Sequence, residues 1–258
     1  MISGLTIVRN AIKNGYIIQE VIWTLQQICD EVIVCDGYSD DGTHEYLQQQ
    51  DIKLYQDDWN LKSNNGLEFA RITNLGLDRC SGGYILYLQA DEIIHEKDFD
   101  TIKELIKTET YNSIYFDFHH IRYNFDYELN EGYKQAIRII KNKKTIRSCD
   151  DAYSFGGDTN PSYSPRINIY HYGYVFIKNI LQKMINHHQY FYVDANNYKK
   201  RKELAEHYLS ELENGKKLDP LEIQSILEPE YKLIKHNLET PKIMKRLEKC
   251  TEYTIEQT

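Results

Sequence analysis

The stretch Val32-Ile33-Val34-Cys35-Asp36-Gly37-Tyr38-Ser39-Asp40-Asp41-Gly42-Thr43 decides the fold class of this chain. The strand predicted over residues 31–35 is apolar from Val32 onward, which is typical of a strand that is buried on both faces. That strand ends in a carboxylate, a turn rich in Gly and Ser follows, and a helix through Leu47 comes next. A buried strand, a polar turn and a helix in this order indicate the start of a βαβ unit.

The same alternation continues on both sides of this stretch. The sequence predicts helices over residues 16–28 and 67–77, and strands over residues 4–8, 52–55 and 84–88. Apolar strands separated by helical patterns favour a parallel sheet. Right-handed crossovers place every strand's carboxyl end at one edge, where ligands of open α/β sheets bind. We therefore expect Asp36, the turn 39–41 and Asp91 at that edge.

The second half of the chain has a different order of predicted elements. A helix is expected over residues 98–107, and the segments that follow favour strands with long polar loops between them. These predicted strands are residues 113–122, 135–141, 144–147 and 167–175, followed by a helix over residues 178–188. Because helices no longer alternate with strands here, we expect this half to add antiparallel or mixed strands to the sheet.

A change in composition near residue 198 suggests a boundary. Residues 199–258 hold twelve basic and twelve acidic side chains, so the whole net charge of −8 lies in residues 1–198. We predict one domain over residues 1–198, made of two halves, 1–100 and 101–198. The remainder, residues 199–258, is expected to be a small helical appendage. Its predicted helices are 199–212, 220–227 and 241–252, with Asn214-Gly215 ending the first.

The composition excludes several classes of protein. With 41% apolar and 27% charged residues, the chain is typical of a soluble globular protein. A net charge of −8 argues against a nucleic-acid groove, which needs clustered Lys and Arg. No apolar run approaches the 18 or so residues of a transmembrane helix, and no secretory leader is expected. Five cysteines without C-x-x-C spacing indicate reduced thiols in a cytoplasmic protein.

The turn after Asp36 has the residue types of a nucleotide site. A carboxylate at the end of a strand can accept hydrogen bonds from a ribose or a base N–H. The N-terminus of the next helix offers free backbone N–H groups to a phosphate. Ser39, Asp40 and Asp41 also suit helix caps, and for these residues both interpretations stay open. We assign Asp36 to a ligand, because caps are already available three residues later.

The turn Gln89-Ala90-Asp91-Glu92 is the second candidate site. Two acidic side chains directly after a buried strand are costly unless a positive group lies beside them. A divalent cation on a diphosphate is a natural partner, because hard cations take oxygen ligands from one or two carboxylates and from phosphates. Asp91 is the stronger candidate and Glu92 the weaker. A helix cap before Ile93 is the alternative.

Taken together, these motifs resemble family 2 glycosyltransferases of the GT-A fold. The resemblance covers residues 1–100, and a later strand is similar to the His-Tyr-Gly strand of the same proteins. Residues 69–76 resemble the family's middle element, through Phe69, Ala70, Arg71, Asn74 and Gly76. The other stretches that carry it are Val8-Arg9-Asn10, residues 34–43, residues 83–92 and Ile169-Tyr170-His171-Tyr172-Gly173-Tyr174-Val175. It implies a catalytic domain over residues 1–198, built on a Rossmann-like mixed sheet flanked by helices. Residues 1–100 would be its nucleotide-binding half and residues 101–198 its acceptor half.

The resemblance also implies roles for individual residues. A nucleotide-diphosphate sugar would lie across the sheet edge, with Asp36 on the nucleoside and Asp91 on a metal-bound diphosphate. His171 would complete the site for Mn²⁺ or Mg²⁺, although a histidine between two tyrosines in a strand is also a common packing residue. Gln89 stands where the family has an Asp, so one charge of that motif is absent. The full donor-binding set implied is Arg9, Asp36, Ser39, Asp40, Arg71, Gln89, Ala90 and Asp91.

Sugar transfer with inversion needs a carboxylate beside the acceptor hydroxyl, opposite the leaving group. The loop with Asp150 and Asp151 follows the nucleotide-binding half and precedes an aromatic, Gly-containing segment. We prefer Asp151 over Asp150 as the base, and a solvent-exposed acidic loop is the alternative. Arg138 and Lys178 could pair with phosphates or be surface charges.

The sequence as a whole predicts a metal-assisted glycosyltransferase with a carbohydrate acceptor. UDP is the preferred nucleotide by its frequency in the family, and the 22 tyrosines fit a carbohydrate groove. One alternative is a nucleotidyltransferase, although the turn after the first strand has a single Arg and no pair of glycines. The other is a binding module without catalysis, which the exchange at Gln89 would fit.

Overall fold

The computed structural model describes residues 1–60, 66–186, 195–250 and 252–255. Its first four strands form a parallel sheet in the spatial order β3-β2-β1-β4. They are β1 (Ile2–Val8), β2 (Glu31–Asp36), β3 (Lys53–Gln56) and β4 (Tyr84–Tyr87). This order confirms the predicted βαβ half. The chain moves from β1 to β2 on one side and returns to β4 on the other, and ligands of such sheets bind where the order reverses.

Helices cover both faces of this parallel half. Side chains of β1 alternate between the two faces, as a strand requires. Val8 belongs to the buried cluster on the face that α2 covers, and Leu5 packs with α4 on the other face. A Cβ on Gly76 of α4 would lie 2.5 Å from the Leu5 side chain, so this glycine lets the helix approach the strand closely. The helices are α1 (Ala11–Asn14), α2 (Ile18–Ile28), α3 (Thr43–Leu47), α4 (Leu67–Arg79) and α5 (Phe99–Lys107).

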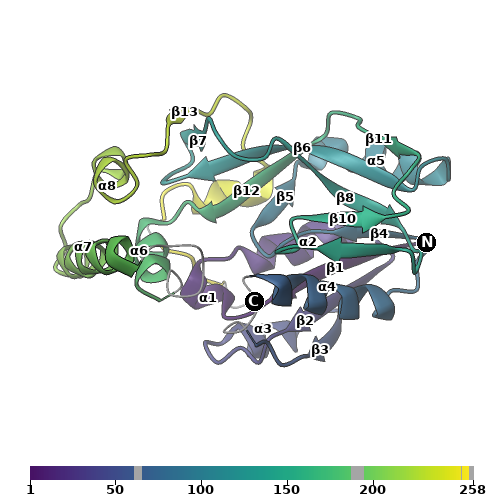
Figure 1. Ribbon diagram of the computed structural model, residues 1–258, viewed down its shortest axis with the longest axis horizontal. Helices are drawn as coiled ribbons and strands as arrows, with labels where there is room; N and C mark the ends of the chain where they lie inside the picture. The colour runs from purple at the N-terminus through teal and green to yellow at the C-terminus, as the bar shows by residue number, and fades with distance from the viewer. Residues whose placement is uncertain (61–65, 187–194, 251, 256–258) are drawn as a thin grey trace.

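The second half adds mixed strands, as predicted. β8 pairs antiparallel with β4 and with β6, while β12 runs parallel to β6 and antiparallel to β5. In Figure 1 these strands lie above the parallel half. Their bounds are β5 (Glu92–Ile94), β6 (Ser113–Arg122), β7 (Tyr127–Leu129), β8 (Gln135–Lys141), β11 (Ser162–Tyr163) and β12 (Asn168–Tyr174).

The strand predicted over residues 144–147 differs in position and in partner. The structure has β9 (Ile146–Cys149), which pairs with β10 (Ser154–Gly157) in a separate two-stranded sheet. This hairpin packs against α4, and Ile146 and Phe155 are buried there. The hairpin therefore packs between α4 and β8 instead of extending the main sheet.

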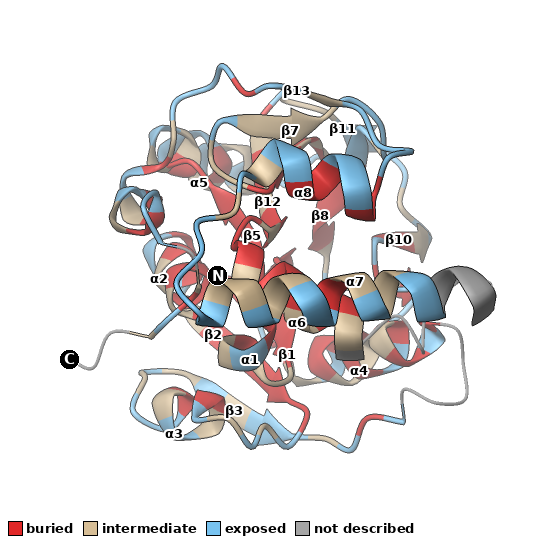
Figure 2. Ribbon diagram, turned by 90° about the vertical axis from the view of Figure 1, so that its left-hand side faces the viewer, coloured by how far each residue is buried: buried red, intermediate tan, exposed pale blue. Residues whose placement is uncertain are grey.

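The C-terminal region is partly helical and partly integrated into the core. α6 (Ile177–Asn186) packs against α7 (Ala195–Glu213), and α8 (Pro220–Leu227) follows. Figure 2 shows α7 lying across this side of the molecule, with exposed residues along it. The predicted helices 199–212 and 220–227 are confirmed, and the boundary placed at residue 198 lies within α7. Residues 187 and 188 of the helix predicted over 178–188 are outside the described residues.

The last segment differs from its prediction as a helix over 241–252. Among the described residues of that range, the structure has a 3-10 helix, η2 (Lys242–Leu247). Met244 and Leu247 are three residues apart and both are buried in the main core, and a 3-10 turn places residues at that spacing on one side. Ahead of it, β13 (Leu233–Lys235) pairs with β7 and extends the sheet. None of the described helices is long and apolar enough to cross a membrane.

Candidate active site

A cavity of about 740 Å³ lies at the carboxyl ends of β1 and β4, where the strand order reverses. Its lining mixes aromatic rings with a few charged and amide side chains. These residues are Ile7, Val8, Arg9, Asn10, Lys13, Asn14, Tyr16, Trp59, Asn60, Phe69, Tyr87, Gln89, Ala90, Asp91, Tyr133, Asp151, Tyr153, His171 and Tyr174. Such composition, apolar walls with few convergent polar groups, is typical of small-molecule sites.

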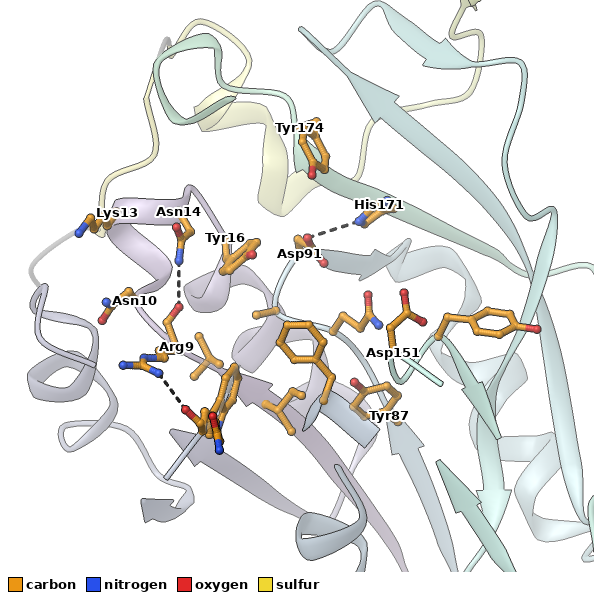
Figure 3. A pocket seen from close by; sticks show the side chains of 18 of the residues that line it. Arg9, Asn10, Lys13, Asn14, Tyr16, Tyr87, Asp91, Asp151, His171 and Tyr174 are labelled. Carbon is orange, nitrogen blue, oxygen red and sulfur yellow. Dashed lines mark hydrogen bonds and ion pairs between the residues drawn. The ribbon is translucent and has the colours of Figure 1, made fainter. Parts of the chain in front are cut away.

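The charged groups are distributed along the cavity. Figure 3 places Arg9 and Lys13 at one end and Asp151 at the other, with Asp91 and His171 between them. Of the eleven site residues predicted from sequence, the structure thus brings Arg9, Gln89, Ala90, Asp91, Asp151 and His171 into one lining. The other five, Asp36, Ser39, Asp40, Arg71 and Asp150, lie outside that lining within the described chain.

Asp36 anchors the turn that follows it. Its carboxylate is fully buried and accepts hydrogen bonds from the Ser39 hydroxyl at 2.6 Å and from His44 Nδ1 at 2.8 Å. Ser39 Oγ accepts the Asn10 backbone N–H at 2.8 Å, and the Asp40 N–H donates to Asn10 Oδ1 at 2.9 Å. Asn10 itself has a φ of 54°. These contacts hold Asn10 in its left-handed backbone conformation. They thereby fix the backbone next to Arg9 and the position from which its side chain extends.

Arg71 holds a different part of the wall. Its guanidinium pairs with Glu68 at 2.6 Å and donates to the Asp58 carbonyl at 2.6 Å. Glu68 accepts the Asn60 N–H at 2.9 Å. Trp59 stands between these anchored residues, buried at the cavity wall, and its indole N–H has no hydrogen-bond partner among the described residues. Arg71 therefore positions the Trp59 segment from outside the cavity.

The two acidic residues of the turn after β4 have different surroundings. Glu92 is fully buried and forms a two-contact ion pair with fully buried Arg138, at 2.6 Å each. The positive group that Glu92 requires is thus supplied by the chain itself, and Arg138 is no surface charge. Lys178, in contrast, is partly exposed and pairs with Glu252.

Asp91 is directed into the cavity and pairs with His171. Its Oδ2 lies 3.3 Å from His171 Nε2. Burial opposes ionisation of this carboxyl, but the charge and hydrogen bond of His171 and the charge of Lys183 hold the pKa of Asp91 below its ordinary value. Asp91 is therefore an anion held beside an imidazole.

His171 is oriented by a second histidine that the sequence did not identify as part of the site. His120 Nδ1 lies 2.9 Å from His171 Nδ1, and His120 Nε2 lies 3.0 Å from the Tyr133 carbonyl. Burial and the charge of His171 lower the pKa of His120 to about 3, so this ring is neutral. A neutral His120 that donates from Nε2 must accept at Nδ1. His171 therefore carries a proton on Nδ1 and directs Nε2 at Asp91.

Two further residues shape the space around this pair. A Cβ on Gly173 would lie 2.4 Å from Asp91 Oδ2 and 3.0 Å from His171 Nε2, so the glycine leaves room between these donor atoms. Lys183 of α6 is buried behind this wall, donates to the Gly173 carbonyl and lies 4.1 Å from the centre of the Tyr16 ring. Burial lowers the pKa of Lys183 to about 7, although Asp91 acts in the opposite direction.

Asp151 is exposed at the far end of the cavity, on a loop with two fixed points. The Ala152 carbonyl accepts a hydrogen bond from Gln89 Nε2 at 3.2 Å, and the Tyr153 carbonyl accepts one from Arg138 at 2.7 Å. Asp150, with a φ of 51°, forms the turn before it. The sequence did not reveal that Lys183 lies behind the cavity, that His120 orients His171, or that Arg138 holds the loop of Asp151. In each case the partner is distant along the chain.

The chain is similar to several solved glycosyltransferase structures. Staphylococcus aureus TarS has 15% identity and a TM-score of 0.42, over 81% of this chain and 42% of TarS, so the chain spans about two fifths of that protein's length. TarS 1–349 in complex with UDP-GlcNAc has 14% identity and a TM-score of 0.43, over 81% of this chain and 70% of that chain. Glucosyl-3-phosphoglycerate synthase from Mycobacterium tuberculosis, in complex with Mn²⁺, UDP and phosphoglyceric acid, has 19% identity and a TM-score of 0.36, over 46% and 43% of the two chains.

No curated protein matches the sequence. The model of glycosyl transferase family 2 matches residues 7–168, a range that begins in β1 and includes the turns after β1, β2 and β4. Because this match extends over more than half of the sequence, and the sheet has the predicted GT-A arrangement, the chain belongs to glycosyltransferase family 2.

Proposed function

We propose that this protein transfers a sugar from a nucleotide-diphosphate donor, with UDP as the nucleotide, to an acceptor hydroxyl with inversion. The observation that carries the proposal is the Asp91–His171 pair, held between the cationic end of the cavity and Asp151 (Figure 3). A cation-bridged diphosphate fits the middle of this arrangement. The nucleoside would then lie towards Arg9 and the acceptor towards Asp151.

A divalent metal fits the residues at the centre of the cavity. A carboxylate oxygen and an imidazole nitrogen converge there, and Gly173 leaves the space that a side chain would fill. This mixed donor set favours Mn²⁺ over Mg²⁺, which prefers oxygen ligands. When bound, the ion would neutralise charge on the departing diphosphate. His120 keeps His171 Nε2 directed at the site, as hydrogen-bonded partners of metal-binding histidines do.

The nucleoside end combines an aromatic wall with cations. Trp59 offers a ring face and an indole N–H that has no hydrogen-bond partner in the described part of the chain, and Arg9 and Lys13 offer positive charge. A Cβ on Gly37 would lie 2.8 Å from the Trp59 ring, so that ring packs directly on the backbone after Asp36. In this proposal Asp36 acts on the nucleoside by fixing the turns that carry Arg9 and Trp59.

The acceptor end provides the base. Asp151 would remove the proton of the attacking hydroxyl as it adds to the anomeric carbon opposite the diphosphate. Tyr133 and Tyr153 lie beside it with ring centres 5.5 Å apart, and aromatic faces of this kind pack on sugar C–H groups. Gln89 links the donor end of the cavity to the acceptor end, because it follows β4 beside Asp91 and its amide donates to the Ala152 carbonyl in the loop of Asp151.

The test is the product released when purified protein is incubated with UDP-sugars and Mn²⁺. Release of UDP, slow with water and faster with an acceptor, supports the transferase. Release of pyrophosphate from nucleotide triphosphate and sugar phosphate would instead support a nucleotidyltransferase, and binding without turnover would support a non-catalytic module. A thermal-shift panel of UDP-, GDP- and dTDP-sugars with and without Mn²⁺ identifies the donor first.

A cytoplasmic location stays a prediction. It is supported by the five cysteines, which are all free thiols in the structure. Reduced thiols persist in compartments kept reducing by glutathione and thioredoxin.

A further inference from the structure

A second group of potential metal ligands lies apart from the cavity, where the C-terminal segment joins the sheet. His119 comes from β6, Glu128 from β7, and His236 directly follows β13. Glu128 Oε2 lies 2.9 Å from His119 Nδ1 and 2.8 Å from His236 Nδ1. One donor atom from each residue lies within 4.8 Å of the other two.

The strand register explains why these residues converge. Glu128 is opposite Ile121 of β6, and Ile234 of β13 is opposite Glu128. Residues two apart on a strand point to the same face, so His119 and His236 both lie on the face of Glu128. The three strands β6, β7 and β13 are neighbours in Figure 1. Each contributes one ligand to the same face of the sheet.

This face is opposite to the one that serves the donor cavity. His119 and His120 are adjacent on β6, so their side chains point to opposite faces. His120 contacts His171 of the cavity, while His119 contacts Glu128. The same alternation holds in β12, where Tyr170 lies with its ring 6.0 Å from His119 and 5.9 Å from His236. The two histidine groups are thus separate sites on one pair of strands.

We propose that His119, Glu128 and His236 bind a zinc ion that fastens the C-terminal segment to the sheet. Two imidazoles and one carboxylate form a three-ligand zinc set with a fourth position left for water. The His119 side chain is 25% exposed, so an ion and its water can reach the group from solvent. Hard ions such as Mg²⁺ and Ca²⁺ prefer sites built wholly of oxygen ligands, whereas this group has two imidazole nitrogens and a single carboxylate.

The distances are compatible with this ion after a small adjustment. Zinc bonds of about 2.0–2.2 Å to nitrogen and oxygen place tetrahedral ligand atoms about 3.3–3.5 Å apart. Glu128 Oε2 lies about half an ångström closer than that to both imidazoles, at 2.9 and 2.8 Å. The ion would replace the two protons that now bridge the carboxylate and the rings. Because His236 belongs to the C-terminal segment, binding would fix that segment to β6 and β7.

The experiment measures zinc binding to the full chain after treatment with EDTA and dialysis. The background variant is His171→Ala, which removes the imidazole of the donor site and so isolates the second group. We expect calorimetry to find one zinc per chain in this variant. Adding Glu128→Gln or His236→Ala should weaken binding at least a hundredfold, whereas adding His207→Ala, on exposed α7, should leave it unchanged.

A second measurement locates the ion without using activity. Zinc should slow proteolytic cleavage within residues 228–240 in the His171→Ala variant, and the Glu128→Gln variant should show no such protection. Mass spectrometry of the fragments identifies the cleavage sites. Absence of bound zinc, equal affinity in the Glu128→Gln variant, or protection only outside residues 228–240 would overturn the proposal. Each result is independent of whether the cavity transfers a sugar.

Discussion

At the scale of single residues, the site depends on a chain of contacts that begins outside the cavity. The Tyr133 carbonyl fixes the tautomer of His120, His120 holds the proton on His171 Nδ1, and His171 Nε2 faces Asp91. The ends of this chain were predictable, because Asp91 follows a buried strand and His171 belongs to a family motif. His120 was not, because its role depends on strand pairing between residues 51 positions apart.

Gln89 gives the first prediction, because it stands where the family has an Asp. If the exchange of Asp for Gln at this position had no effect other than the loss of a metal ligand, restoring the carboxylate in Gln89→Asp would strengthen Mn²⁺ binding. Here the amide donates to the Ala152 carbonyl at 3.2 Å, and a carboxylate at this position would instead face another acceptor. A lost hydrogen bond that leaves a polar group unpaired costs about 1–3 kcal/mol. We therefore expect Gln89→Asp to lower kcat by about ten- to a hundredfold, an energy cost of that size.

Steady-state kinetics over a Mn²⁺ titration test this expectation. Gln89→Asn is the control for side-chain length, since it keeps an amide on a shorter chain. A faster enzyme with tighter Mn²⁺ binding in Gln89→Asp would contradict the positioning role.

Lys183 gives a prediction about pH and stability. Burial lowers its pKa from 10.5 to about 7 in the folded protein. Between these pH values the unfolded chain holds a proton that the folded protein does not, so raising the pH stabilises the folded state. The free energy of unfolding of the wild type should rise from pH 7 to pH 9, relative to Lys183→Met, by up to about 1.4 kcal/mol per pH unit. Urea denaturation at several pH values measures this difference, and parallel curves would contradict it.

At the scale of elements, the apolar strands were predictable and the shortest ones were not. Strands β1, β2 and β4 are buried along nearly their whole length, and this burial is what a continuous apolar run reports. Strands such as β7 and β13, with three residues each, have no period long enough to detect. The segment of η2 has helical apolar spacing, but burial of Met244 and Leu247 favours a 3-10 turn.

The pairing of Glu92 on β5 with Arg138 on β8 leads to a stability prediction. Both side chains are fully buried, 46 residues apart. Removing one partner of a buried ion pair leaves an uncompensated charge and costs about 3–5 kcal/mol. Glu92→Gln should therefore lower the free energy of unfolding by about that amount, measured by urea denaturation.

The double variant Glu92→Leu/Arg138→Met is the matched test of this explanation. Replacing both charges with apolar groups removes the uncompensated charge, so stability should largely recover. Transfer should stay impaired, because Arg138 no longer donates to the Tyr153 carbonyl of the loop with Asp151. A double variant less stable than Glu92→Gln would show that the pair itself is strongly stabilising.

At the scale of the whole molecule, the C-terminal region is joined to the catalytic half by buried contacts. Glu228 pairs with Arg122 of β6 and accepts a hydrogen bond from the Tyr123 hydroxyl at 2.6 Å. Arg246 pairs with buried Glu20 of α2, and Tyr253 is buried in the main core. The boundary at residue 198 was predicted from the balance of charged residues. Most charged side chains lie at the surface, so their balance carries no information about these buried contacts.

Truncation tests how far the two regions depend on each other. Met244, Leu247 and Tyr253 are all buried in the main core, and each such side chain contributes about 1.5–3 kcal/mol on burial. The stabilisation lost with these three side chains is comparable to the whole free energy of unfolding of a typical domain, about 5–15 kcal/mol. The fragment 1–198 should therefore lack a cooperative unfolding transition by circular dichroism, while a control ending at residue 255 keeps one. A cooperative transition in the fragment 1–198 would show that it folds alone.

The most direct test of the proposed reaction is calorimetric titration of UDP with and without Mn²⁺. Three proteins are compared: the wild type, Asp91→Asn and Asp151→Asn. We predict that the wild type and Asp151→Asn bind UDP with the same Mn²⁺-dependent gain in affinity, whereas Asp91→Asn loses that gain. An equal Mn²⁺-dependent gain in Asp91→Asn would contradict the assignment of this carboxylate to a metal-bound diphosphate.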